Sequence, residues 1–350
     1  MLKTLSPENI AVLRLSALGD CINAYGLIGA IRQAYPDAHT TFIVDRRFSS
    51  IFGQGGPCSI CAPDFRREGL ASLCWLRQQL KNEVFDVLLD MQTSIKASMC
   101  SMFIKSPMKI GYDSARSREG QRLFVDTTVK PARDQHVMSG FLEFAKAIGI
   151  DDPRPSWDFG IGDDELQKAR GLFKGGKKVF ALSPASAKEY KNWNAEGYAR
   201  ACEYLHERDF EVALIGDSSP ACAQLCQGIR DRLGFEVTDL AGKTSLRELL
   251  AVIKCADLML SPDSGPMHIA SAVGTPVVGL FAIHSERRVG PYNFMDLCVS
   301  VYDQCAKEEL GEREVPWRYR VRNEQAMGRI SFEDVKIQID KALSQYIIKG

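Results

Sequence analysis

The sequence predicts an α/β protein built from two consecutive halves, each with a doubly wound parallel sheet. Short apolar runs alternate with longer amphipathic stretches from end to end, which is the pattern of strand–helix–strand units. The chain has 350 residues. One hydrophobic core rarely organises so long a chain, so two domains are expected.

In the first half, the apolar run at residues 10–15 predicts a strand. A helix is expected to follow at about residues 24–34. The apolar runs at residues 40–44 and 87–91 predict two further strands of the same sheet. Strands separated by helices of this length imply parallel pairing.

A second alternating series fills the other half of the chain. Its predicted strands are residues 178–183, 211–215, 257–261 and 277–281, and its predicted helices include residues 196–208 and 245–255. Between the two series, residues 151–157 are polar and rich in proline, which indicates a connector. We therefore expect domains at residues 1–160 and 161–330, with their sheets facing a central cleft.

Composition narrows the function classes. The chain carries 44 Lys and Arg residues against 44 Asp and Glu residues, so no basic field indicates nucleic acid as a partner. A content of 45% hydrophobic and 25% charged residues excludes a disordered or fibrous protein. We find no apolar stretch long enough to span a bilayer and no apolar segment of a signal peptide at the amino terminus. A cytoplasmic protein is expected.

The eleven cysteines are too sparse for a disulfide scaffold. Cys58 and Cys61 form the only CxxC pair, without the further ligands that a zinc site needs. One interpretation is a structural or redox site. The other, which we favour, is that the cysteines are reduced, small core residues.

The loop after the first predicted strand carries a carboxylate. Gly19 allows a tight turn, and Asp20 follows it at the entry to the next helix. Asp20 can cap that helix, or it can face the site as a general base. The loop is not a GxGxxG fingerprint, so a dinucleotide site is not expected.

Two loops of the second half suit an anion. In one, a strand ends and Asp263 and Ser264 offer capping oxygens. Gly265 lets the backbone approach a ligand, and Pro266 suits the first turn of a helix whose free N–H groups form an anion site. The alternative is a crossover helix in which His268 is merely packed. The other loop, residues 183–193, brings lysines close to a helix start, or is a solvated basic loop.

These segments resemble glycosyltransferase family 9, the ADP-heptose:lipopolysaccharide heptosyltransferases. The resemblance lies in Arg14-Leu-Ser-Ala-Leu-Gly-Asp20, Phe85-Asp-Val-Leu-Leu-Asp-Met-Gln92, Lys191-Asn-Trp193, Leu240-Ala-Gly-Lys-Thr-Ser-Leu246 and Asp263-Ser-Gly-Pro-Met-His-Ile-Ala270. It runs from about residue 10 to about residue 292. The motif that begins at Asp263 is specific, and the order and spacing of the others strengthen it.

The chain departs from the family pattern in three places. After Phe281 the family usually continues with Gly-Pro-Thr, whereas this chain has Ala-Ile-His284. The helix after Asp20 commonly carries a proline in the family, and here the stretch is Asn23-Ala-Tyr-Gly26. An arginine often follows Gln-His, where this chain has Val-Met-Ser139.

The resemblance implies the GT-B architecture of two Rossmann-like domains, acceptor on the first and nucleotide sugar on the second. It also implies that a final helix within residues 331–350 packs back on the first domain. The implied reaction is inverting transfer of heptose from ADP-heptose to the inner core of lipopolysaccharide in a Gram-negative bacterium, with Asp20 as general base. Neither a metal nor a cofactor is expected. The donor-binding residues implied are Ser186, Lys191, Thr244, Asp263, Ser264, Gly265, Pro266, Met267 and His268.

The acceptor of this family is an anionic glycolipid, and the first half carries matching charge. Residues 96–133 contain eight basic and three acidic side chains in a chain that is neutral overall. One interpretation is a groove whose charge steers the anionic acceptor, and the alternative is a basic surface that is merely solvated. The candidates for acceptor binding are Arg66, Arg67, Lys96 and Arg118. Such a protein would work at the inner face of the cytoplasmic membrane, without an obligate protein partner.

Two other functions stay open at this point. One is a family 9 transferase with another nucleotide sugar or acceptor. The other is a nucleotide-binding module without catalysis, against which the carboxylate of Asp20 argues.

Overall fold

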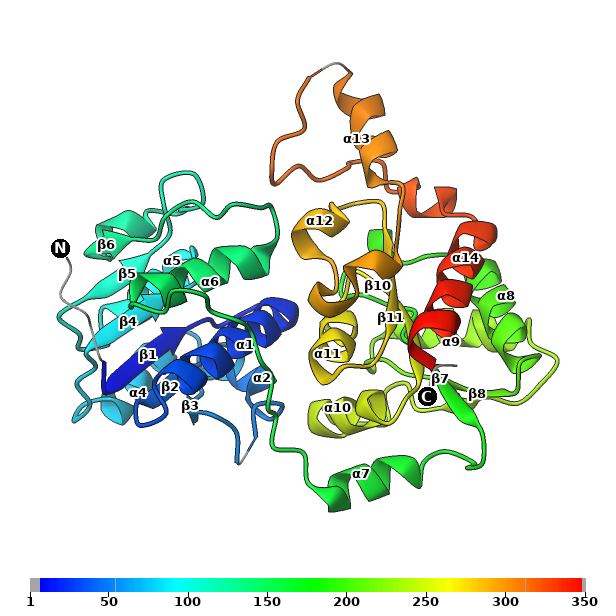
Figure 1. Ribbon diagram of the computed structural model, residues 1–350, viewed down its shortest axis with the longest axis horizontal. Coiled ribbons are helices and arrows are strands. Elements are labelled where there is room, and N and C mark those ends of the chain that lie inside the picture. The colour runs from blue at the N-terminus through cyan, green and yellow to red at the C-terminus, as the bar shows by residue number, and fades with distance from the viewer. Residues whose placement is uncertain (1–6, 54, 312, 348–350) are drawn as a thin grey trace. The chain divides into compact units, whose positions relative to one another are not determined.

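The described residues form two six-stranded sheets, and the strand pairings within both are parallel (Figure 1). This computed structural model describes residues 7–53, 55–311 and 313–347. The chain divides into two units, Met1–Gly160 and Ile161–Gly350. The prediction of an α/β fold with two parallel sheets is confirmed.

The sheet of the first unit has the strand order β3-β2-β1-β4-β5-β6. Its strands are β1 (Asn9–Leu13), β2 (His39–Ile43), β3 (Ser59–Cys61), β4 (Val87–Asp90), β5 (Lys109–Gly111) and β6 (Thr127–Thr128). Val12 of β1 pairs with Phe42 on one side and with Leu89 on the other. The chain therefore builds outward from β1 to β3, returns to the middle, and continues from β4 to β6.

Helices link these strands. They are α1 (Leu18–Ala34), α2 (Arg46–Ser49), α3 (Phe65–Glu68), α4 (Ala71–Gln79), α5 (Ile95–Ser101), the 3₁₀ turn η1 (Gln121–Leu123) and α6 (Val137–Ala147). Residues on every side of α1 are buried, because α6 and the connector pack against it. A side chain at Gly26 would lie 2.5 Å from the Trp157 ring. Glycine is needed at this close approach.

The connector predicted at residues 151–157 is tied to the first unit. Trp157 Nε1 donates to the carbonyl oxygen of Ile22 at 2.8 Å. Tyr25 Oη donates to the carbonyl oxygen of Asp158 at 2.9 Å, and the Tyr25 ring stacks on Phe159. These contacts fix the segment that leads to the second unit.

The sheet of the second unit has the order β12-β11-β10-β7-β8-β9. Its strands are β7 (Lys178–Leu182), β8 (Phe210–Leu214), β9 (Thr238–Asp239), β10 (Leu258–Pro262), β11 (Val277–Phe281) and β12 (Cys298–Ser300). In order of appearance this is the same arrangement as in the first unit, three strands outward on one side and three on the other. Both sheets thus have the 3-2-1-4-5-6 order of dinucleotide-binding folds.

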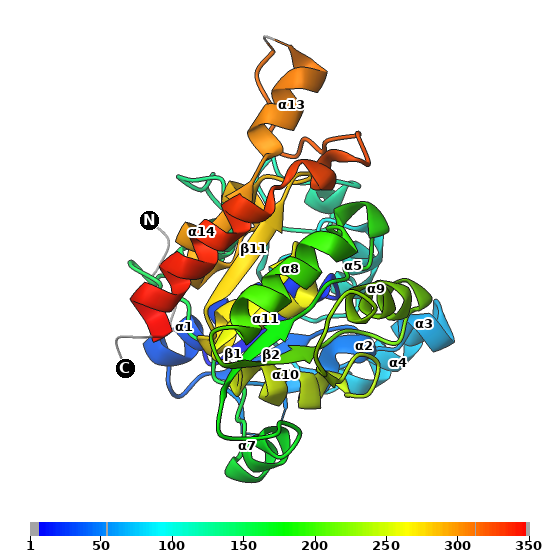
Figure 2. The same ribbon diagram turned by 90° about the vertical axis from the view of Figure 1, so that its right-hand side faces the viewer.

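The helical elements of the second unit are α7 (Asp163–Arg170), η2 (Glu189–Lys191), α8 (Ala195–His206), α9 (Pro220–Arg230), α10 (Leu246–Lys254), α11 (Gly265–Val273), α12 (Glu286–Val289), η3 (Tyr292–Leu297), α13 (Tyr302–Leu310), η4 (Ala326–Arg329), α14 (Phe332–Ala342) and the π turn η5 (Leu343–Ile347). Helix α13 projects from the rest of this unit in both views (Figures 1 and 2).

The last helix, α14, packs on elements of the second unit, and its expected packing on the first unit stays a prediction. Figure 2 shows it beside β11 and α8, and contacts with both are present. Trp193, which is buried, donates through Nε1 to the carbonyl oxygen of Ile330 at 3.0 Å. The guanidinium of Arg200 lies 4.2 Å from the Phe332 ring centroid. Val335 and Ile339 of α14 are buried, and their burial adds an apolar contribution to the packing of this helix.

Candidate active site

Asp20 lies in the first turn of α1, because this helix begins at Leu18, earlier than the sequence predicted. Its carboxylate forms an ion pair with the guanidinium of Arg14, just beyond the end of β1. Arg14 also donates to the carbonyl oxygen of Met91 at 2.5 Å. The residue at the N-cap position is Ala17, so Asp20 does not cap the helix.

Arg14 is a fixed cation beside this carboxylate. Burial alone would lower the pKa of Arg14, but the Asp20 carboxylate raises it, and the result lies above the ordinary value. The guanidinium carbon lies 5.5 Å from the ring centroid of Phe141. The side chain of Asp20 is 30% exposed, against 14% for Arg14. A carboxylate held in this way is accessible to a hydroxyl group of a bound molecule.

Gln92, directly after β4, holds the segment between β1 and Asp20. Its side-chain oxygen accepts from the backbone N–H groups of Leu15 at 2.7 Å and Ser16 at 3.1 Å. Its Nε2 donates to Ser94 Oγ at 2.8 Å. The position of the carboxylate therefore depends on two neighbouring strands of the sheet.

Asp90 lies beneath this loop at the end of β4 and is fully buried. Within the described residues its Oδ2 has no hydrogen-bond partner. Gln121 Nε2 donates to the backbone carbonyl oxygen of Asp90 at 2.7 Å. Burial raises the pKa of Asp90 to about 7.

The four residues predicted to bind the acceptor are exposed. Arg66 and Arg67 belong to α3, Lys96 lies in the first turn of α5, and Arg118 follows β5. These segments come after β3, β4 and β5, so they leave the sheet at its carboxyl edge, as the Asp20 loop does.

Two contacts join these segments. The ammonium of Lys96 lies 4.9 Å from the ring centroid of Phe65, which links α5 to α3. Glu119 accepts from the backbone N–H of Ile95 at 2.7 Å, which links the Arg118 loop to the start of α5. The segments that carry the four predicted cations are thus linked to one another by these two contacts.

In the second unit, Asp263 connects two loops that carry cations. Lys191 Nζ donates to Asp263 Oδ2 at 2.7 Å, and His284 Nδ1 lies 2.9 Å from the same oxygen. Burial alone would raise the pKa of Asp263, but the hydrogen bond with His284 and the charge of Lys191 hold it well below its usual range. Asp263 is therefore ionised and neutralised by its neighbours.

Helix α11 begins next to this cluster. Ser264 is the N-cap, and its Oγ lies 2.8 Å from Ser261 Oγ instead of capping the helix. Gly265 and Pro266 form the start of the helix. With no side-chain cap on the first turn, its N–H groups are available to an anion, which the helix dipole also favours.

The remaining predicted donor residues have different surroundings. Met267 and His268 are buried in α11. Ser186 Oγ donates to the carbonyl oxygen of Lys188 at 2.8 Å, within the Lys191 loop. Thr244 precedes α10, and its buried Oγ1 has no hydrogen-bond partner in the described parts of the chain.

Both candidate sites lie where their sheet changes direction. In the first unit, Asp20 follows β1 and Gln92 follows β4, and these two strands are neighbours. In the second, Lys191 follows β7 and Asp263 follows β10, which are also neighbours. A parallel sheet binds ligands at this point, beyond the carboxyl ends of the strands.

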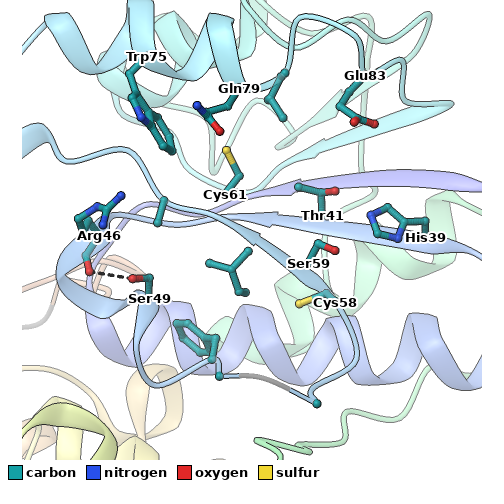
Figure 3. Close-up of a pocket in the computed structure, with 16 residues that line it drawn as sticks. His39, Thr41, Arg46, Ser49, Cys58, Ser59, Cys61, Trp75, Gln79 and Glu83 are labelled. Atoms are coloured by element: carbon teal, nitrogen blue, oxygen red, sulfur yellow. Dashed lines mark hydrogen bonds between the residues drawn. The ribbon is translucent and has the colours of Figure 1, made fainter.

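A hollow of about 720 Å³ lies elsewhere in the first unit, along the edge strand β3 (Figure 3). Trp75 and Gln79 border it on one side of the sheet, and Arg46 and Ser49 on the other. None of the predicted site residues is among those that line it. It is separate from the switch point between β1 and β4.

The cysteines are free, including Cys58 and Cys61. Burial raises the pKa of both thiols to about 12, so neither is a reactive thiolate. Among the described side chains, no group of three His, Cys, Asp or Glu residues is placed to hold a metal ion. No helix in the described ranges is long and apolar enough to cross a membrane.

Together, the fold and the sites define a two-domain α/β protein with a carboxylate at one switch point and an anion cradle at the other. The model of glycosyltransferase family 9 (heptosyltransferase) matches residues 74–316. The chain is 37% identical over 340 residues to the lipopolysaccharide core heptosyltransferase OpsX of Haemophilus influenzae, covering 97% of this chain and 98% of that one. The chain belongs to glycosyltransferase family 9, and the resemblance stated from its motifs is confirmed.

Solved structures agree on the fold. The family 9 glycosyltransferase of Veillonella parvula superposes with a TM-score of 0.79 at 19% identity, covering 98% of each chain. The Escherichia coli heptosyltransferase WaaC with ADP gives a TM-score of 0.74 at 18% identity, covering 95% of this chain and 99% of that one. At such identities the likeness concerns the GT-B fold alone.

Sequence reasoning missed two partners in these sites. Arg14 was part of a quoted motif but had no assigned role. A charged residue at the end of an otherwise apolar run was the available signal. His284 was noted only as a departure from the family pattern, and its contact with Asp263 depends on the pairing of β10 with β11.

Proposed function

We propose that this protein is an inverting glycosyltransferase that moves heptose from ADP-heptose to the anionic inner core of lipopolysaccharide. The observation that carries the proposal is the pair of sites: a partly exposed carboxylate at one switch point and a cationic cradle beside a helix N-terminus at the other. Membership of family 9, with a heptosyltransferase 37% identical over nearly the whole chain, supports this sugar.

The second unit would hold the donor. A sugar nucleotide leaves as ADP, and negative charge grows on the diphosphate as the bond to the anomeric carbon breaks. Lys191 and the N–H groups at the start of α11 suit that charge. Groups placed where charge develops stabilise the transition state, in addition to binding the ground state.

The first unit would hold the acceptor and the base. Asp20 takes the proton of an acceptor hydroxyl while that oxygen bonds to the anomeric carbon. The bond between this carbon and the diphosphate oxygen breaks, and its electron pair leaves with ADP. One displacement of this kind inverts the anomeric centre, and the residues named here perform it without a covalent enzyme intermediate. Arg14 orients the carboxylate.

The acceptor surface would consist of the cations on α3, α5 and the loop after β5. Exposed apolar side chains stand among them: Leu70 is 68% exposed, Ile95 49% and Leu123 86%. Cations interspersed with exposed leucine and isoleucine suit an anionic lipid surface, since charge attracts the head groups and the apolar groups enter the interface. This supports a peripheral position at the inner face of the cytoplasmic membrane.

A donor panel tests the proposal. Purified protein is incubated with ADP-heptose, ADP-glucose and UDP sugars, each with an acceptor made of lipid A and its acidic inner sugars, and released nucleotide diphosphate is measured. We expect release only with ADP-heptose plus acceptor, and release slower by about 10² or more from an Asp20→Asn control. Turnover with a different sugar would establish the alternative family 9 activity. Tight ADP binding without any turnover would instead indicate a binding module.

A further inference from the structure

His284 stands in the candidate donor site with a role that the family resemblance does not supply. It follows β11 and replaces the threonine that the family pattern expects. Its side chain is 18% exposed, close to the 17% of Lys191 and the 13% of Asp263. The imidazole is therefore partly accessible to solvent, as the Lys191 side chain is.

The contact with Asp263 fixes the proton on one ring nitrogen. Asp263 Oδ2 already accepts from Lys191 at 2.7 Å, and the low pKa of Asp263 keeps it ionised. An ionised carboxylate only accepts hydrogen bonds, so Nδ1 of His284, 2.9 Å away, carries a proton. The other nitrogen, Nε2, remains as the position at which His284 gains or loses charge.

We propose that His284 takes up a proton at Nε2 when a nucleotide diphosphate binds and becomes a second cation, beside Lys191, for the diphosphate. This rests on the proposed function. The carboxylate of Asp263 lies within hydrogen-bond distance of both Lys191 and His284, so one carboxylate faces both side chains. An arriving dianionic phosphate adds negative charge that a protonated imidazole compensates, and Asp263 holds the ring in place for it.

Other charged groups on the neighbouring segments have partners of their own. Arg287 pairs with Asp303, and Glu286 accepts from Ser300 Oγ at 2.6 Å. Arg288 lies 5.6 Å from the Trp317 ring centroid, and Arg320 lies 4.2 Å from that of Tyr190. The segment with Arg320 is joined to the His284 loop, because Val321 N donates to the carbonyl oxygen of Ile283 at 3.0 Å. Asp263 thus contacts His284 directly, and Lys191 contacts the same carboxylate oxygen.

Proton uptake on ADP binding measures this directly. Titration calorimetry of the whole chain with ADP, in two buffers of different ionisation enthalpy, gives the number of protons taken up per ADP. The pH is kept at 7.5 and above, because a phosphate loses its second proton near about pH 6. We expect net uptake by the wild type, and an affinity that falls as pH rises, by up to about tenfold per pH unit for one full proton.

Two variants locate the proton. His284→Asn and His284→Thr should lose the uptake and the pH dependence, and at pH 7.5 they should bind ADP about tenfold more weakly. Thermal melting verifies that both are folded, and the threonine variant restores the family residue. His206→Asn, which removes a histidine stacked on Phe235 in the same unit, is the matched control and should retain both properties.

The outcomes are distinct. Uptake that disappears in both His284 variants but persists in His206→Asn supports the inference. Wild-type ADP binding without proton uptake, or uptake unchanged in the His284 variants, overturns it and leaves the proposed function standing. Failure of the wild type to bind ADP would overturn the proposed function and this inference together.

Discussion

Arg14 and Asp20 form an ion pair between the end of β1 and the first turn of α1. The pair places a carboxylate beside the switch point of the first sheet, and the Gln92 side chain holds the intervening backbone. A general base needs a defined position before it needs any particular pKa. Here the strand order of the sheet supplies that position.

Removing the charge of the carboxylate tests its role. Asp20→Asn should lower kcat by about 10² or more, because the acceptor hydroxyl then loses its proton acceptor, while affinity for ADP stays the same. Steady-state kinetics and ADP calorimetry check the two halves. Near-normal turnover in this variant would remove Asp20 from the mechanism.

The ion pair itself is tested by a double-mutant cycle. Arg14→Met and Asp20→Asn should each reduce stability, whereas the double variant should lose less than the sum, since neither charge is then left without its partner. We expect a coupling of about 1–3 kcal/mol from urea denaturation. Additive losses would mean that the pair contributes nothing beyond its separate residues.

On the donor side, Lys191→Ala should weaken ADP binding by about 10- to 100-fold, the range for one charge-assisted hydrogen bond. Lys188→Ala is the matched control, since it removes an ammonium group of the same loop and retains the backbone carbonyl oxygen that accepts from Ser186. Equal effects of the two changes would show that only the general charge of the loop matters.

Much of the fold was predictable, for a physical reason. The long strands, such as β1, β7 and β11, are continuous apolar runs because both faces of a parallel sheet are covered. Strands β3, β5, β6, β9 and β12 have only two or three residues and show no such run, so the sequence analysis did not include them. The packing of α14 on the first unit was expected from the GT-B architecture and not from the residues of the helix, and it stays a prediction.

For the site, the motifs led to Asp20, Lys191 and Asp263, each of which follows a predicted strand. Their partners could not be found in this way. Asp263 lies 72 residues from Lys191 and 21 from His284, and only the order of β7, β10 and β11 in the sheet brings the three loops together. The register of a sheet, more than local pattern, determines such contacts.

Asp90 gives a prediction for stability. Burial raises its pKa to about 7 in the folded protein, whereas an unfolded Asp has a pKa of about 3.9. The folded state therefore binds more protons between these values, and the stability of the wild type falls as pH rises from about 4 to about 7. Asp90→Asn removes this loss and should stabilise the protein at pH 8 by about 1–3 kcal/mol, with a smaller gain at pH 5.

Urea denaturation at the two pH values measures the Asp90 effect. Asp37→Asn, a change at an exposed carboxylate of the same unit, should alter stability little at either pH. A destabilisation of Asp90→Asn that is equal at pH 5 and pH 8 would contradict the assignment of a buried, titrating carboxyl.

The last prediction concerns the acceptor surface of the first unit. Arg66→Glu combined with Arg67→Glu should raise the KM for the anionic acceptor and leave ADP affinity unchanged, because these cations on α3 are proposed to bind the acceptor and stand in a different unit from the proposed donor residues. The increase should shrink as salt is added, since exposed charges more than about 8 Å apart are screened at physiological ionic strength. The control, Arg32→Glu with Lys81→Glu, makes the same charge change near the other edge of the sheet, after which KM should stay normal. Acceptor KM at low and high salt, measured for both double variants, decides between a steering surface and a solvated one. A KM that rises equally in the two double variants would show only an effect of net charge, and no rise in either would leave Lys96 and Arg118 as the remaining candidates.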